Sequence, residues 1–184
     1  STVGCVPIRK TIVNNWYKYI MTRVNVVSPQ LLTDQHLMAE YREIPMVPAS
    51  LRRSNSSKRG LNLRDQPTSY TLNKGHVKFF YDKGYFLHNR YNMLVDELRQ
   101  RGYNVNPDGR AVNWSIFDQS LNNDWSATDY DQLVNMQRII QRIEQKTIPW
   151  YRYYGQLITS DQYIQLITTS VPPIVRQIWG GQRD

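Results

Sequence analysis

The sequence has little of what disulfide frameworks, metal centres and membrane spans require. It contains one cysteine, Cys5, and three histidines that do not cluster with other metal-binding side chains. These counts exclude an internal disulfide framework and a thiolate zinc site, and we expect neither a metal nor another cofactor. No run of about 18 apolar residues occurs, so no membrane span is expected. A Gly-rich phosphate loop and a GxSxG motif are also missing.

Acidic side chains are in the minority. Lys and Arg number 23 against 15 Asp and Glu, which gives a formal net charge of +8 at pH 7. Such an excess favours a polyanionic partner, either nucleic acid or an anionic membrane surface. The length of 184 residues and the 40% of hydrophobic residues suit one globular domain with a sizeable core. The lone cysteine fits a reducing, cytoplasmic compartment.

The spacing of apolar residues predicts a mainly α fold, a single compact domain of three main helices with long ordered loops. The first helix follows Ser28 and Pro29, a favourable helix start, and stops before Pro45. The second ends at Gly102, which is placed as a C-cap, and the third begins near Ser126 or Thr128. The predicted helices are 29–44, 84–101 and 128–146, with a short fourth helix capped by Ser160 and Asp161. Residues 50–67 are predicted to form an exposed basic loop, and residues 104–124 a second loop.

Two helices carry candidate working faces. On the first, Gln35, Arg42 and Glu43 fall on one polar side. On the third, Arg138 and Arg142 stack one turn apart, as a ridge that follows a nucleic-acid backbone or as an ordinary solvated face. These two interpretations carry equal weight.

Several motifs together resemble the pyrimidine-dimer DNA glycosylases, the phage-type ultraviolet endonucleases, which are glycosylase/AP lyases. The motifs are Met-Thr-Arg-Val-Asn at 21–25, Asp-Gln-His-Leu-Met-Ala-Glu-Tyr-Arg-Glu at 34–43, Gly-His-Val-Lys-Phe-Phe-Tyr-Asp-Lys at 75–83, Arg-Gly-Tyr-Asn at 101–104 and Trp-Tyr-Arg-Tyr-Tyr-Gly at 150–155. The resemblance covers residues 21–158. We therefore expect a glycosylase-like domain over 22–158, an N-terminal extension or leader over 1–21 and a C-terminal extension over 159–184.

The resemblance implies a nucleophile and a catalytic carboxylate. In that family the nucleophile is the α-amine of a threonine exposed by removal of the initiator Met, and Thr22 holds that place here. An α-amine, with a pKa of roughly 7.7–8.0, is far more often neutral at pH 7 than a lysine at about 10.4. The amine attacks C1′ of a cyclobutane pyrimidine dimer and forms an imine, which eliminates the 3′ phosphate. Glu43 matches the carboxylate that assists these proton transfers.

The resemblance also implies a set of DNA-binding residues. Arg23 and Arg42 correspond to arginines that grip phosphates, a task that suits the guanidinium fork. Gln35 and His36 match residues near the kinked step of the DNA. Trp150 and Tyr151 are expected near the lesion, where aromatic stacking contributes about 1–3 kcal/mol per base. Met46 stands where the family has another arginine, and nearby basic side chains are candidates to replace it: Arg52, Arg53, Lys58 and Arg59.

Two functions remain open. If Thr22 is the mature terminus, the chain is a DNA repair enzyme whose partners are dimer-containing duplex DNA and nonspecific duplex DNA. If residues 1–21 block the amine, the nitrogen of Thr22 is an amide and the chain is a catalytically silent homologue, a nucleic-acid-binding or structural component of a nucleoprotein assembly. A monomer is expected outside such an assembly. Residues 1–20 are basic and contain no acid, which leaves organelle targeting open.

Overall fold

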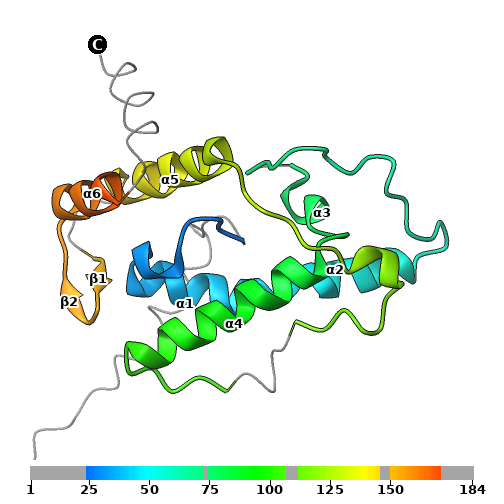
Figure 1. Ribbon diagram of the computed structural model, residues 1–184, viewed down its shortest axis with the longest axis horizontal. Coiled ribbons are helices and arrows are strands. Elements are labelled where there is room, and N and C mark those ends of the chain that lie inside the picture. Colours follow the sequence, from blue (N-terminus) through cyan, green and yellow to red (C-terminus); the bar gives the residue numbers. More distant parts are fainter. Residues whose placement is uncertain (1–23, 73, 107–111, 146–149, 171–184) are drawn as a thin grey trace, which may run out of the picture.

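The computed structural model describes residues 24–72, 74–106, 112–145 and 150–170, and it is mainly helical (Figure 1). The longer helices are α1 (Asp34–Glu43), α2 (Met46–Asn55), α4 (Gly84–Gln100), α5 (Asp129–Glu144) and α6 (Ser160–Thr169). The shorter elements are η2 (Pro29–Leu31), α3 (His76–Phe79), η3 (Gln119–Leu121) and the strands β1 (Arg152–Tyr153) and β2 (Gln156–Leu157), which pair antiparallel. The mainly α fold predicted from the sequence is confirmed.

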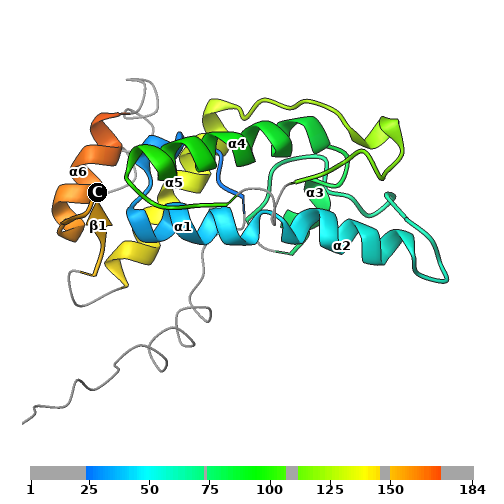
Figure 2. The same ribbon diagram turned by 90° about the horizontal axis from the view of Figure 1, so that it is seen from below.

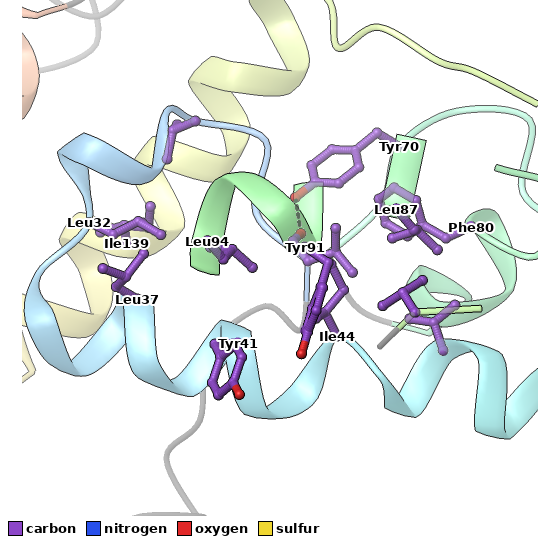
Figure 3. Close-up of a cluster of buried hydrophobic side chains, with 14 of the residues drawn as sticks. Leu32, Leu37, Tyr41, Ile44, Tyr70, Phe80, Leu87, Tyr91, Leu94 and Ile139 are labelled. Carbon is purple, nitrogen blue, oxygen red and sulfur yellow. Dashed lines mark hydrogen bonds between the residues drawn. The ribbon is translucent and has the colours of Figure 1, made fainter. Parts of the chain in front are cut away.

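Helix α4 lies alongside α1, and α5 with α6 covers another side of the same core (Figure 1). Figure 2 shows α1 and α2 following one another along one edge of the molecule. Leu37 of α1 and Ile44, which directly follows α1, lie in the same buried cluster as Leu87 and Leu94 of α4 and Ile139 of α5 (Figure 3). All five are fully buried. Each contributes about 1.5–3 kcal/mol relative to an exposed side chain, so this core fixes the relative positions of the helices.

The first predicted helix was wrong at its start. Only Pro29–Leu31 forms a 3-10 turn, Leu32 is extended, and α1 begins at Asp34. The cause is the N-cap Thr33, whose hydroxyl accepts the N–H of His36 at 3.3 Å. The predicted stop at Pro45 marks a two-residue turn rather than the end of the helical region.

The predicted basic loop at 50–67 was also wrong in its first part, because α2 extends to Asn55. Val47, Pro48 and Leu51 are buried along one side of α2 and supply the apolar contact that holds it. Pro48 lies in the first turn, where the missing N–H breaks no helical hydrogen bond.

The other predicted helices are confirmed to within two residues. Helix α5 has Thr128 as its N-cap, with a capping box to Asp131. Helix α4 is followed by Gly102 at φ 82°, the left-handed conformation that glycine adopts readily. Helix α6 is capped by Thr159, one residue before the predicted Ser160. The loop predicted over 104–124 contains only the short η3, and residues 107–111 lie outside the described residues.

Helix α6 packs against α5 and reaches the core. Tyr163 and Ile167 are fully buried, and the Tyr163 hydroxyl donates a hydrogen bond to the backbone oxygen of Leu31 at 2.7 Å. Residues 160–169 therefore pack with the same core as the region expected to be the glycosylase-like domain; the domain boundaries themselves stay a prediction. Within the described ranges no helix is long and apolar enough to cross a membrane.

Candidate functional site

The described chain begins at Val24, so Thr22 and Arg23 lie outside the described residues. The backbone of residues 24–27, which directly follows them, runs through the interior of the protein. Val24, Asn25 and Val27 are all at most 3% exposed. The polar groups of this segment therefore need partners inside the protein.

Glu40 of α1 and Arg90 of α4 supply the first set of partners. The Glu40 carboxylate accepts hydrogen bonds from the backbone N–H of Asn25 at 3.0 Å and from its side-chain amide at 2.8 Å. Arg90 donates to both oxygens of the same carboxylate, at 2.8 and 2.9 Å, and to the backbone oxygen of Val27 at 2.6 Å. Both charged side chains are almost fully buried, and the bidentate pairing compensates their desolvation.

Asn135 of α5 supplies the second set. Its side-chain oxygen accepts the backbone N–H groups of Val26 and Val27 at 2.9 and 3.3 Å. Its amide nitrogen donates to the side-chain oxygen of Asn25 at 2.9 Å. We call Asn25, Glu40, Arg90 and Asn135 together the polar clamp; it joins α1, α4 and α5 around residues 24–27.

His76 and Tyr70 hold the residue nearest to Thr22. The N–H of Val24 donates to Nε2 of His76 at 3.2 Å, while Nδ1 of that ring lies 2.6 Å from the backbone oxygen of Thr71. Because Nε2 accepts, His76 is neutral with its proton on Nδ1. Figure 3 shows the hydroxyl of Tyr70 donating to the backbone oxygen of Val24, at 3.3 Å.

Glu43 lies in the last turn of α1, one turn beyond Glu40 and on the same buried side. Its exposure is 8%, whereas the neighbouring Arg42 is exposed. A carboxylate in this position is shielded from bulk water and close in sequence to the helix residue that binds Asn25. Such a group suits proton transfer in an enclosed site.

His36 is part of the interior. It is 5% exposed, and its ring lies 4.8 Å from the ring of Tyr151. Burial lowers the pKa of His36 to about 3, so the ring is neutral at physiological pH. Nδ1 of His36 has no hydrogen-bond partner among the described residues.

Gln35 uses its side-chain amide to hold the β hairpin. Its nitrogen donates to the backbone oxygen of Trp150 at 2.6 Å, and its oxygen accepts the N–H of Arg152 at 2.9 Å. Tyr151, between these two residues, is buried, while Trp150 is 38% exposed. Gln35 and His36 thus both contact the segment that was expected near the lesion.

Asp34 holds the tip of the same hairpin. Its carboxylate accepts the N–H groups of Tyr154 at 3.1 Å and Gly155 at 2.8 Å, and it pairs with Arg101 at 2.9 Å. Tyr154 and Gly155 have φ values of 50° and 78°, as a two-residue type I′ turn requires. Arg101 also pairs with Glu97 at 2.7 Å, so the C-terminal end of α4 is tied to the same point.

Arg138 and Arg142 are both half-buried on the side of α5 that carries Asn135. Burial raises the pKa of Tyr151 to about 12, and the positive charge of Arg142 opposes that shift. Burial likewise raises the pKa of Tyr70, and Arg138 is among the cations that oppose it. Arg138 and Arg142 thus have partly buried side chains, and whether they bind a nucleic-acid backbone stays a prediction.

Exposed cations lie along α1, α2 and the loop that follows: Arg42, Arg52, Arg53, Lys58, Arg59 and Arg64. Met46, where the family pattern has arginine, is 41% exposed at the start of α2. In the described ranges no group of three or more His, Cys, Asp or Glu side chains could hold a metal ion.

The polar clamp was not predicted from the sequence. Glu40 and Arg90 sit in helices whose apolar spacing gives no sign that a charged residue points inward. The one available signal was Asn25, a polar residue inside the apolar run from Val24 to Val27, because a buried amide in such a run needs partners from elsewhere.

The fold and the site define a small basic helical protein with an enclosed carboxylate beside an anchored N-terminal segment. Residues 21–110 match the model of the family described as pyrimidine dimer DNA glycosylase. This match confirms the resemblance that the motifs indicated, and it supports a DNA repair role as a DNA glycosylase. The matched range contains Thr22, Glu40, Glu43, His76 and Arg90, and ends before α5.

Proposed function

We propose that this protein excises cyclobutane pyrimidine dimers from duplex DNA and then nicks the strand by β-elimination. The proposal rests on the family match and on one observation of the structure, the anchoring of residues 24–27 beside the helix that carries Glu43. Thr22 is the nucleophile, Glu43 is the acid/base, and no cofactor takes part.

Covalent geometry keeps the proposed nucleophile near this helix. Consecutive Cα atoms are about 3.8 Å apart, so the Cα of Thr22 is within about 7.6 Å of the Cα of Val24. The backbone of the next residue, Asn25, is bonded to Glu40, one turn from Glu43. A nucleophile at Thr22 and an acid/base at Glu43 are therefore compatible with one site.

The reaction proceeds in two stages. The neutral α-amine of Thr22 attacks C1′ of the 5′ nucleotide of the dimer, the glycosidic bond breaks, and the base leaves with its electron pair and a proton. The bound amine loses a proton, the C1′–O4′ bond of the sugar then breaks as O4′ takes up a proton, and a protonated imine forms at C1′. A proton is then removed from C2′, and the 3′ phosphate leaves by β-elimination. Glu43 assists base departure and the later proton transfers.

The remaining site residues bind and open the DNA. Four arginines neutralise phosphates: Arg23, Arg42, Arg138 and Arg142. Trp150 and Tyr151 border the extruded nucleotide. Gln35 and His36 hold these two aromatic residues through contacts with the hairpin. Extrusion costs less at a dimer than at a normal step, because the damaged bases stack and pair poorly.

Borohydride trapping tests the nucleophile. Protein that begins at Thr22 should be trapped covalently on dimer-containing or abasic DNA, whereas the 184-residue form should not, because an amide nitrogen does not form an imine. All the contacts described above lie within residues 24–170, so the shorter form retains them. Efficient trapping of the longer form, with the adduct mapped to Ser1 or to a lysine, would remove Thr22 from the mechanism.

The role of Glu43 is tested by Glu43→Gln in the form that begins at Thr22. This change keeps the size of the side chain and removes the carboxylate, so we expect gel-shift affinity for dimer DNA close to that of the unchanged protein and loss of nicking. Undiminished strand cleavage would exclude Glu43 as the acid/base.

The second candidate function is a catalytically silent homologue that binds nucleic acid within a larger assembly. The exposed cations along α2 are compatible with it, since they bind phosphates without chemistry. Duplex binding by both forms, with trapping by neither, is the result that would favour this function.

A further inference from the structure

The polar clamp and His76 provide a side-chain acceptor for every backbone N–H group of residues 24–27. Within residues 24–27, the four backbone N–H groups all donate to side chains: that of Val24 to His76, that of Asn25 to Glu40, and those of Val26 and Val27 to Asn135. None of these bonds belongs to a helix or a sheet. These four hydrogen bonds therefore come from side chains elsewhere in the sequence, beside the packing of Val24 and Val27 in the core.

The clamp holds the backbone in direction as well as in place. Glu40 grips both the backbone and the side chain of Asn25, while Asn135 bonds the side chain of the same residue from the α5 side. Because Asn25 is hydrogen-bonded from both α1 and α5, the segment cannot rotate about its own axis without breaking one of these contacts. Arg90 adds a bond to the backbone oxygen of Val27 and so fixes the far end.

A bond that ties together buried, charged side chains is poor evidence of stability, because desolvation offsets most of the Coulomb attraction. Geometry is what such a pair supplies well, through short bidentate contacts. In this chain these contacts fix the positions of residues 24–27, which directly follow Thr22 and Arg23.

We propose that Glu40, Arg90 and Asn135 are positioning residues of the glycosylase reaction: they fix the direction in which the chain before Val24 leaves the core, and thereby the approach of the N-terminal amine to C1′. They touch neither DNA nor the reacting atoms. The inference rests on the proposed function, because it needs an N-terminal nucleophile.

Substitution of a positioning residue should lower the reaction rate without weakening DNA binding. Misplacement of a nucleophile by about 1 Å can cost on the order of a hundredfold in rate. Most of the proposed DNA contacts, those of the exposed cations, of Arg138 and Arg142 and of the aromatic hairpin, lie outside the clamp. Although Arg23 adjoins residues 24–27, Kd should therefore stay close to that of the wild type.

The test uses Asn135→Ala, which removes the acceptor for Val26 and Val27 and the donor to Asn25, with Tyr163→Phe as the matched control. The control removes one buried hydrogen bond, to Leu31, from the neighbouring helix α6 and does not touch residues 24–27. The wild type and both variants are compared as the 184-residue chain and as the form beginning at Thr22. The measurements are Tm, Kd for dimer DNA, the single-turnover nicking rate and the rate of borohydride trapping on abasic DNA.

We expect Asn135→Ala to lose roughly tenfold to a hundredfold in nicking and trapping rate with Kd unchanged, and Tyr163→Phe to lose Tm but not rate. Glu40→Asp, which keeps the charge but shortens the reach to Asn25 and Arg90, should show a loss of rate of similar size with Kd close to that of the wild type. Full rate in Asn135→Ala overturns the positioning role and leaves the proposed function intact. A wild-type protein that neither nicks nor traps in either form overturns both.

Discussion

His36 shows how the surroundings of one side chain decide its chemistry. As a histidine beside Gln35 in a DNA-binding motif, it suggests a surface contact. In the structure it is buried against Tyr151, and its pKa is lowered to about 3 because the charged ring would lose its hydration. A neutral imidazole that packs on an aromatic ring positions that ring rather than binding phosphate.

The pKa of His36 predicts how the stability of the protein depends on pH. In the unfolded chain this histidine takes up a proton near pH 6.5, and in the folded protein only near pH 3. Between these values the unfolded state binds more protons, so the free energy of unfolding falls as the pH falls. The contribution of one such group is at most about 1.4 kcal/mol per pH unit.

His36→Gln should therefore flatten the decline in stability between pH 6.5 and pH 4, measured by urea unfolding at each pH. His88→Gln is the control, since His88 is exposed. Equal slopes in the wild type and in His36→Gln would contradict the assignment of the acid sensitivity to His36.

Single residues were predictable from the sequence to the extent that they belong to a motif. Glu43 was identified by its motif, and the structure adds that it is enclosed, which no spacing rule gives. Glu40, three residues earlier in the same motif, was passed over because its partner Arg90 lies 50 residues away. Pairings of this kind depend on how helices are arranged, and one sequence does not contain that arrangement.

At the scale of elements, the hairpin β1–β2 is too short to be stable by itself. Two strands of two residues each are held by side chains of α1: Gln35 bonds the backbone on both sides of Tyr151, and Asp34 binds the turn. The stability of the aromatic hairpin therefore depends on its hydrogen bonds to α1.

Asp34→Ala should release the tip of this hairpin and destabilise the protein by about 3–5 kcal/mol, because Arg101 is left buried with one carboxylate fewer. Hydrogen exchange of the amides of Tyr154 and Gly155 should rise together with the loss of stability seen in denaturant unfolding. Asp161→Ala, at an exposed position in α6, is the control. Unchanged protection of the two amides would show that the turn holds without Asp34.

Elements were predictable where an apolar stripe and a cap coincide, as in α4 and α5. They were missed where tertiary contacts overrule the local signal. Pro45 indicated a helix end, yet three buried residues of α2 restart the helix one residue later. Before α1, Thr33 takes the capping position that Ser28 was expected to fill. The sequence does not show which of the two residues caps the helix, because Leu32, which lies between them, is buried by contacts with distant parts of the chain.

For the whole molecule, charge is distributed unevenly. The edge of α2 and the following loop carries Arg52, Arg53, Lys58 and Arg59 on exposed side chains. In the interior, Arg90 pairs with Glu40 and Arg101 with Asp34. Long-range attraction of a duplex is therefore expected along this edge.

Binding to undamaged duplex should weaken steeply with salt, with about 0.9 in the log–log slope for each phosphate neutralised. Arg52→Ala with Arg53→Ala should lower the slope by up to about 1.8 if both contact phosphates, and Arg138→Ala with Arg142→Ala tests the α5 ridge in the same way. Arg99→Ala, an exposed cation in the last turn of α4, is the control. A slope that no pair changes would place the duplex on another face.

The polar clamp also has a consequence for the order of events during folding. Asn25 is bonded to Asn135, 110 residues later, and to Glu40, whose partner Arg90 lies 50 residues further on. Closing loops of this length costs entropy before any bond is gained, which makes the docking of residues 24–27 a late step. During synthesis on a ribosome, residues 24–27 cannot complete their hydrogen bonds until α5 has been made. Until then the amino end is accessible to the peptidases and acetyltransferases that act on nascent chains. Modification of the amino end can therefore precede the docking of residues 24–27.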